Sequence, residues 1–187
     1  MPGDRRVRPR FVDRARRLAG SPTMTTDSGT PPTGPKASLA LIDDVLALPF
    51  PAGEESEDSG VRSSGPGHHL LILRAGQDFW DDASTETVEA SEDEIEAEFS
   101  AVATALAERW GEPETVDLWP YLAEDASPVP EPLGQLSNLA GSMQLWRPPA
   151  DAPGAGGRWL GLTVGQADPE FPIWLLAAVG DASTLPV

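Results

Sequence analysis

Five side chains near the middle of the chain are of types that do acid–base or metal chemistry. They are His68, His69, Asp78, Asp81 and Asp82, and the two histidines are the only ones in the sequence. An imidazole can act as a general base or a metal ligand, and carboxylate oxygens bind hard cations. One interpretation is therefore an uncharacterised hydrolase or metal-dependent enzyme that uses this region.

The spacing of these residues favours a structural role instead. Adjacent residues of a strand point to opposite faces of a sheet, so His68 and His69 could hold one metal ion only from a loop. The aspartates match no standard calcium loop, and an acidic turn that anchors Trp80 in the core explains them as well. The chain has no cysteine and no Walker A, nucleophile-elbow or zinc-protease motif. We therefore predict no catalytic residue, no metal site and no cofactor.

Charge is the strongest functional signal. The chain has 13 Lys and Arg against 30 Asp and Glu, a formal net charge of -17. This charge repels phosphates and anionic lipids, so neither nucleic acid nor a membrane is an expected partner, whereas a basic protein is. The sequence also has no apolar run of about 18 residues, the minimum for a membrane span. Together with the absence of cysteine, this predicts a cytoplasmic location.

The start of the chain differs from the rest. Residues 1–23 contain seven Arg and two Asp, a net charge of +5, and Met24 follows. We interpret this segment as the product of a mis-assigned start codon; the alternative is a basic arm that binds an anionic partner. The composition predicts disorder over residues 1–37, and then a single domain over 38–187 with a flexible acidic loop at 52–67.

Residues 91–110 carry the clearest helical pattern. Ser91 and Glu94 fit a capping box, and a glycine and a proline follow the last turn. The apolar stripe of this helix consists of Ile95, Phe99, Val102, Leu106 and Trp110. Such a stripe predicts that the helix packs on a sheet and keeps its acidic face in water.

Shorter patterns complete the expected fold. A short helix is expected between Ser38 and Pro49, and a second short helix or turn over 131–140. Strands are expected at 69–74, 115–122, 142–147, 158–166 and 173–180. This order predicts an α+β fold in which the helices pack on one face of a mixed or antiparallel sheet of about five strands.

Six tryptophans occur beside a single tyrosine. Packing in the core is their simplest role, because an indole buries a large area. In the strand at 158–166, Trp159 faces away from Leu160, Leu162 and Val164. We therefore consider Trp159 as an exposed anchor for a partner instead.

The tryptophan pattern of the C-terminal half resembles a set of small, acidic, uncharacterised actinobacterial proteins. The segments that carry the resemblance, over about 80 residues, are Arg109–Pro113, Leu118–Trp119, Gln144–Trp146, Arg158–Trp159 and Leu175–Val179. The resemblance implies a shared fold and transfers no catalytic residue. In composition alone, the chain is also similar to immunity proteins, many of which are small and acidic.

These observations favour a non-catalytic protein-interaction domain, of which an immunity-type protein for a basic toxin is one version. We predict that an acidic patch sets the association rate with the basic partner, and that Trp159 slows dissociation. The patch consists of Glu89, Glu92, Asp93 and Glu96. A domain whose charge only keeps it in solution is the third interpretation.

Overall fold

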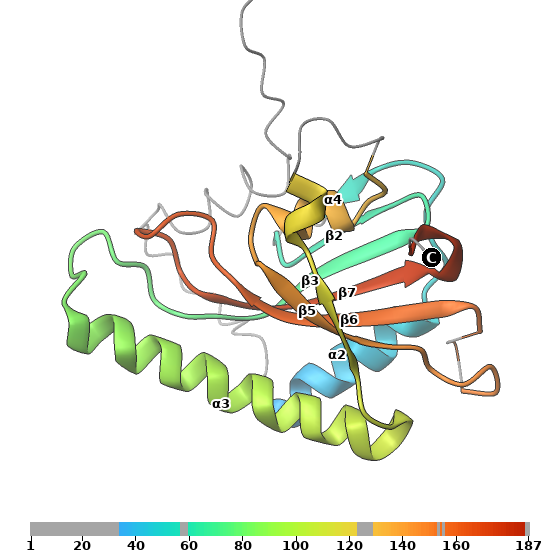
Figure 1. Cartoon of the computed structure of the whole chain (residues 1–187), viewed down its shortest axis with the longest axis horizontal. Helices are drawn as coiled ribbons and strands as arrows, with labels where there is room; N and C mark the ends of the chain where they lie inside the picture. Colours follow the sequence, from blue (N-terminus) through green and yellow to red (C-terminus); the bar gives the residue numbers. More distant parts are fainter. Residues whose placement is uncertain (1–33, 57–59, 123–128, 153, 155, 186–187) are drawn as a thin grey trace, which may run out of the picture.

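The computed structural model describes residues 34–56, 60–122, 129–152, 154 and 156–185. These described residues form an α+β fold around one sheet of seven strands, with a long helix lying across it (Figure 1). The mis-assigned start and most of the predicted disorder concern residues 1–33, which lie outside the described residues. The disorder predicted for residues 34–37 is wrong, because a helix, α2 (Pro35–Ala47), begins there.

All neighbouring strands of the sheet are antiparallel, in the order β1-β2-β3-β7-β6-β5-β4. The strands are β1 (Glu55–Ser56), β2 (Arg62–Gly65), β3 (His68–Ala75), β4 (Glu114–Asp117), β5 (Ser142–Trp146), β6 (Arg158–Gly165) and β7 (Trp174–Asp181). The strand predicted at 115–122 is shorter, because a 3-10 turn, η1, takes over at Trp119–Leu122. The predicted flexible loop at 52–67 is wrong where β1 and β2 form, since β2 pairs with β3.

The interior strands are apolar on both faces. In β7, Leu175, Ala177 and Val179 face one core cluster and Trp174, Leu176 and Ala178 face another. A strand that buries both sets of side chains needs cover on both sides of the sheet. The alternation predicted for β6 is confirmed, because Leu160 and Leu162 belong to the first cluster and Trp159 to the second.

Helices cover both faces. α2 (Pro35–Ala47) and α3 (Thr85–Trp110) pack on the first cluster, and α4 (Leu133–Ser137) packs on the second (Figure 1). The prediction that all helices lie on one face is therefore wrong for α4. Leu133 and Leu136 of α4 are buried against the second face of the sheet. Without α4, the apolar side chains of that face would be in contact with water.

The long helix begins earlier than predicted. Its N-cap is Ser84, whose hydroxyl accepts a hydrogen bond from the Thr87 backbone N–H at 3.4 Å, and Asp82 accepts one from the Ser84 backbone N–H at 2.9 Å. The predicted capping box at Ser91 is wrong, because Ser91 lies buried inside the helix. Its Oγ has no hydrogen-bond partner among the described residues.

This difference makes a testable prediction. Ser84→Ala removes the cap and is expected to cost about 0.5–2 kcal/mol of unfolding free energy. Ser91→Ala removes a buried hydroxyl that makes no hydrogen bond, so we expect its effect to be near zero or slightly stabilising. Urea titrations of the two variants give the comparison. A larger loss from Ser91→Ala would contradict this account of the helix start.

A buried carboxylate joins the two helices to the sheet. Glu98 of α3 accepts a hydrogen bond from Arg74 of β3 at 2.8 Å and one from Ser38 of α2 at 2.6 Å. The hydrogen bond to Glu98 is the main reason that the pKa of Arg74 lies above its usual value. The N-cap of α2 is Gly34, so the helix begins before Ser38, and Ser38 lies inside it as part of this buried network.

The tryptophans divide between core and surface. Trp146, Trp159 and Trp174 are buried, whereas Trp80 and Trp119 are 55% and 68% exposed. The prediction that Trp80 anchors in the core is wrong, since the neighbouring Phe79 takes that place. The exposure considered for Trp159 is also wrong, because its side chain is fully buried and cannot contact a partner.

Candidate functional site: a groove beside the long helix

The histidines and aspartates suggested for catalysis do not come together. β3 is 8 residues long, and a rise of about 3.3 Å per residue places roughly 23 Å between its ends. His68 and His69 begin this strand, whereas Asp78 follows its far end. Asp82 is used at the start of α3, where the Thr87 hydroxyl donates to it at 2.7 Å. Among the residues that the structure describes, no group of three His, Asp or Glu side chains could hold a metal ion.

The two histidines point to opposite faces of the sheet, as predicted from their adjacency. His69 lies on the side of the sheet that α2 and α3 cover, where its Nδ1 is 2.7 Å from the Ser64 hydroxyl and its ring centroid is 5.0 Å from that of Phe50. Burial lowers the pKa of His68 and lowers the pKa of His69 to about 4, and the nearby Arg158 contributes to the shift of His69. Both rings are therefore neutral parts of the core at neutral pH.

The lowered pKa of His69 predicts how stability depends on pH. The unfolded chain protonates this ring near pH 6.5 and the folded chain near pH 4, so the unfolded state binds the extra proton in between. Stability is fully present above pH 6.5 and is expected to fall by about 2–3 kcal/mol by pH 4. Unfolding by urea at several pH values measures this. A His69→Asn variant should show a shallower dependence, and an unchanged slope would contradict the assignment.

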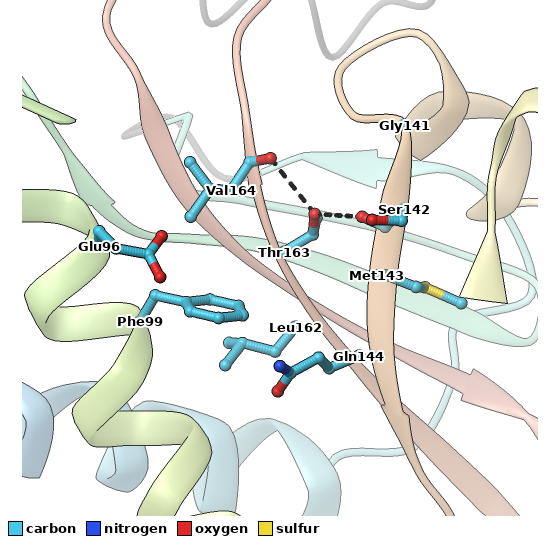
Figure 2. Close-up of a pocket in the computed structure, with 9 residues that line it drawn as sticks. All are labelled: Glu96, Phe99, Gly141, Ser142, Met143, Gln144, Leu162, Thr163 and Val164. Carbon is cyan, nitrogen blue, oxygen red and sulfur yellow. Dashed lines mark hydrogen bonds between the residues drawn. The ribbon is translucent and has the colours of Figure 1, made fainter. Parts of the chain in front are cut away.

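A groove runs between α3 and the strands at the β4 end of the sheet. Its volume is about 260 Å³. It is lined by Glu96 and Phe99 of α3, by residues 141–144 and by Leu162, Thr163 and Val164 of β6 (Figure 2). In Figure 2 the Glu96 carboxylate and the Phe99 ring extend from α3 toward β6, and the amide of Gln144 lies beside Leu162. The groove therefore combines an apolar floor with oxygen atoms on its walls.

One polar atom of the groove lacks a partner. The Gln144 Oε1 is buried and accepts no hydrogen bond from any described residue. By contrast, the Thr163 hydroxyl is used within the fold, since it donates to the Ser142 carbonyl oxygen at 2.6 Å. A buried acceptor without a donor is rare and costs free energy. A ligand with N–H donors would satisfy it.

The four acids predicted to bind a partner lie on one side of α3. At 3.6 residues per turn, Glu89, Glu92, Asp93 and Glu96 fall within an arc of roughly 100°. All four are exposed, and Glu96 lines the groove. Glu94 and Glu98 lie on the other side of the helix, where they pair with Arg74. The structure thus joins the acidic patch to the groove.

Sequence reasoning did not find the groove itself. Phe99 was expected in the core, but it is half-buried and lines the groove. Gln144 does not stand out by itself, although β5 carries a signal: Met143 and Leu145 are apolar and buried, while Ser142 and Gln144, which alternate with them, are polar. A strand with one polar face indicates that this face lacks apolar cover.

Comparison with known protein families, with curated proteins and with solved structures finds no match to this chain. None of the helices in the described residues is both long and apolar enough to cross a bilayer.

The chemistry of the groove suits binding of a cation. Its wall carries the Glu96 carboxylate and the unpartnered Gln144 oxygen, and its floor carries Phe99, Leu162 and Val164. Carboxylate and amide oxygens accept hydrogen bonds, and the face of an aromatic ring attracts cations. The exposed Trp119 side chain lies close to Gly141, one of the residues that line the groove.

Proposed function

We propose that this protein binds a basic segment of a partner protein along the acidic side of α3 and in the adjoining groove. An immunity-type protein that neutralises a basic toxin is one version of this function. We propose that the protein acts in the cytoplasm, because a chain without cysteine cannot form the disulfide bonds that stabilise proteins in oxidising compartments.

The observation that carries the proposal is the position of Glu96. It belongs both to the exposed acidic patch on α3 and to the wall of a groove that holds a buried, unpartnered acceptor. A patch of one charge raises the encounter rate with a partner of opposite charge. A neighbouring concave site with an apolar floor then gives that partner a place to bury side chains.

A designed peptide provides the test. A Gly/Ser peptide with three lysines is passed over the immobilised protein, and its association rate is measured by surface plasmon resonance at 0.01 M and 0.1 M salt. The Debye length falls from about 30 Å to about 10 Å between these conditions, so association should slow with salt. Changing Glu89, Glu92 and Glu96 to Gln and Asp93 to Asn should slow association by about 10-fold or more at low salt.

The matched control neutralises four exposed acids elsewhere, namely Asp44, Glu108, Glu112 and Asp151. Both variants lose the same net charge, so a defined surface predicts that the control keeps most of the association rate. Equal slowing by both variants would mean that net charge alone attracts the peptide. Affinity capture from a host lysate then identifies the natural partner, as a basic protein retained by the unmodified chain and lost with the α3 variant.

A further inference from the structure

We infer that the groove is a pocket for an arginine side chain of the basic partner, and that it prefers arginine to lysine. The inference rests on the proposed function, because it names the group that the groove receives. Its volume of about 260 Å³ lies below the range of roughly 300–1,000 Å³ typical of sites for drug-sized ligands and cofactors. One long side chain suits this size.

The floor of the groove fits the apolar part of such a side chain. It is lined by Phe99, Leu162 and Val164, whose side chains carry no charge. Long basic side chains bury their methylene stems on surfaces of this kind while the charged head meets polar groups. The Phe99 ring lines the groove, and a planar guanidinium stacks on an aromatic ring better than an ammonium does.

The acceptors favour a guanidinium for a second reason. In Figure 2 the Glu96 carboxylate and the Gln144 amide lie on opposite sides of the Phe99 ring. A guanidinium has five N–H donors that point in several directions within one plane, so it can donate to more than one acceptor of the groove at once. It is also less strongly hydrated than an ammonium, which lowers the cost of reaching the buried Gln144 oxygen.

Two peptides of the same length test the preference. Each is a Gly/Ser peptide with three basic residues at the same positions, arginine in one and lysine in the other, and their Kd values are measured by fluorescence anisotropy at 0.1 M salt. The acidic patch alone attracts both equally, because the charges are equal. The groove predicts that the arginine peptide binds about 5- to 10-fold more tightly.

Variants of the groove show whether this preference arises there. Phe99→Leu removes the ring and Gln144→Leu removes the acceptor; each should bring the ratio of the two Kd values close to one while the lysine peptide binds as before. Glu89→Gln, in the patch but outside the groove, should weaken both peptides and keep the ratio. Thermal unfolding checks that the variants fold, and the side-chain amide NMR signal of Gln144 in the unmodified chain should shift with the arginine peptide.

The outcomes separate this inference from the proposed function. Equal Kd values for the two peptides, both weakened by salt, overturn the arginine pocket and leave the acidic binding surface standing. An arginine preference that survives Phe99→Leu and Gln144→Leu also overturns it, because the preference then arises elsewhere. If neither peptide binds, the inference and the proposed function fail together.

Discussion

Replacing Trp159 by alanine is expected to lower the free energy of unfolding by about 3–5 kcal/mol. The indole is fully buried in the core on the α4 side of the sheet, and its Nε1 donates to the Asp181 carbonyl oxygen and the Thr184 hydroxyl, each at 3.0 Å. Alanine would leave a large cavity and would remove the indole N–H donor, while the Thr184 hydroxyl would still donate to the Asp181 carbonyl oxygen at 2.7 Å. Urea unfolding followed by circular dichroism measures the loss.

The matched control is Trp119→Ala. Trp119 is 68% exposed, and surface substitutions usually change stability by no more than about 0.5 kcal/mol. A loss from Trp159→Ala no greater than that from Trp119→Ala would contradict the burial of Trp159. Binding of the basic peptides is a separate readout, in which folded Trp159→Ala protein should bind as the unmodified chain does.

Arg74→Met is the second substitution with a large expected effect. It leaves the Glu98 carboxylate buried, with the Ser38 hydroxyl as its remaining hydrogen-bond donor among the described residues. Removing one partner of a buried ion pair typically costs about 3–5 kcal/mol, because the remaining charge is uncompensated. Thermal or urea unfolding gives the value.

Two further variants test the cause of that loss. Arg109→Met breaks an ion pair with Asp43 in which both side chains are at least 40% exposed, and an exposed pair contributes only about 0–1 kcal/mol. In the Arg74→Met background, Glu98→Gln replaces the buried charge by a neutral amide and should recover part of the stability. If it recovers nothing, an uncompensated charge is not the cause.

Local patterns in the sequence predicted much of the fold. The apolar stripe of α3 is confirmed at Ile95, Val102 and Leu106, which are fully buried. The strands expected at 142–147 and 158–166 are confirmed as β5 and β6, which pair antiparallel. These features follow from periodicity, which depends only on residues close in the chain. The exposure of the four acids on α3 follows from the same periodicity.

The sequence alone does not decide between two serines that could each begin the long helix. Ser84 and Ser91 both precede plausible helical turns, and the helix starts at the first because Ser84 has Asp82 and Thr87 beside it. Ser91 instead packs against Gly76, where a Cβ atom would lie 2.4 Å from its hydroxyl. That contact joins residues of the helix and of the segment after β3, so the spacing within the helix does not reveal it.

The sequence by itself determined the α+β class, the two faces of β6, and the acidic side of α3, because each depends on residue types at fixed local spacing. Only the tertiary structure decided that Trp159 is buried, since its indole lies where the paired strand β7 has Gly180. A Cβ atom at Gly180 would approach the ring to 2.2 Å. The position and lining of the groove also depend on the tertiary structure. Glu96 and Gln144 are far apart in the chain, and the packing of α3 beside β5 and β6 brings them to one site.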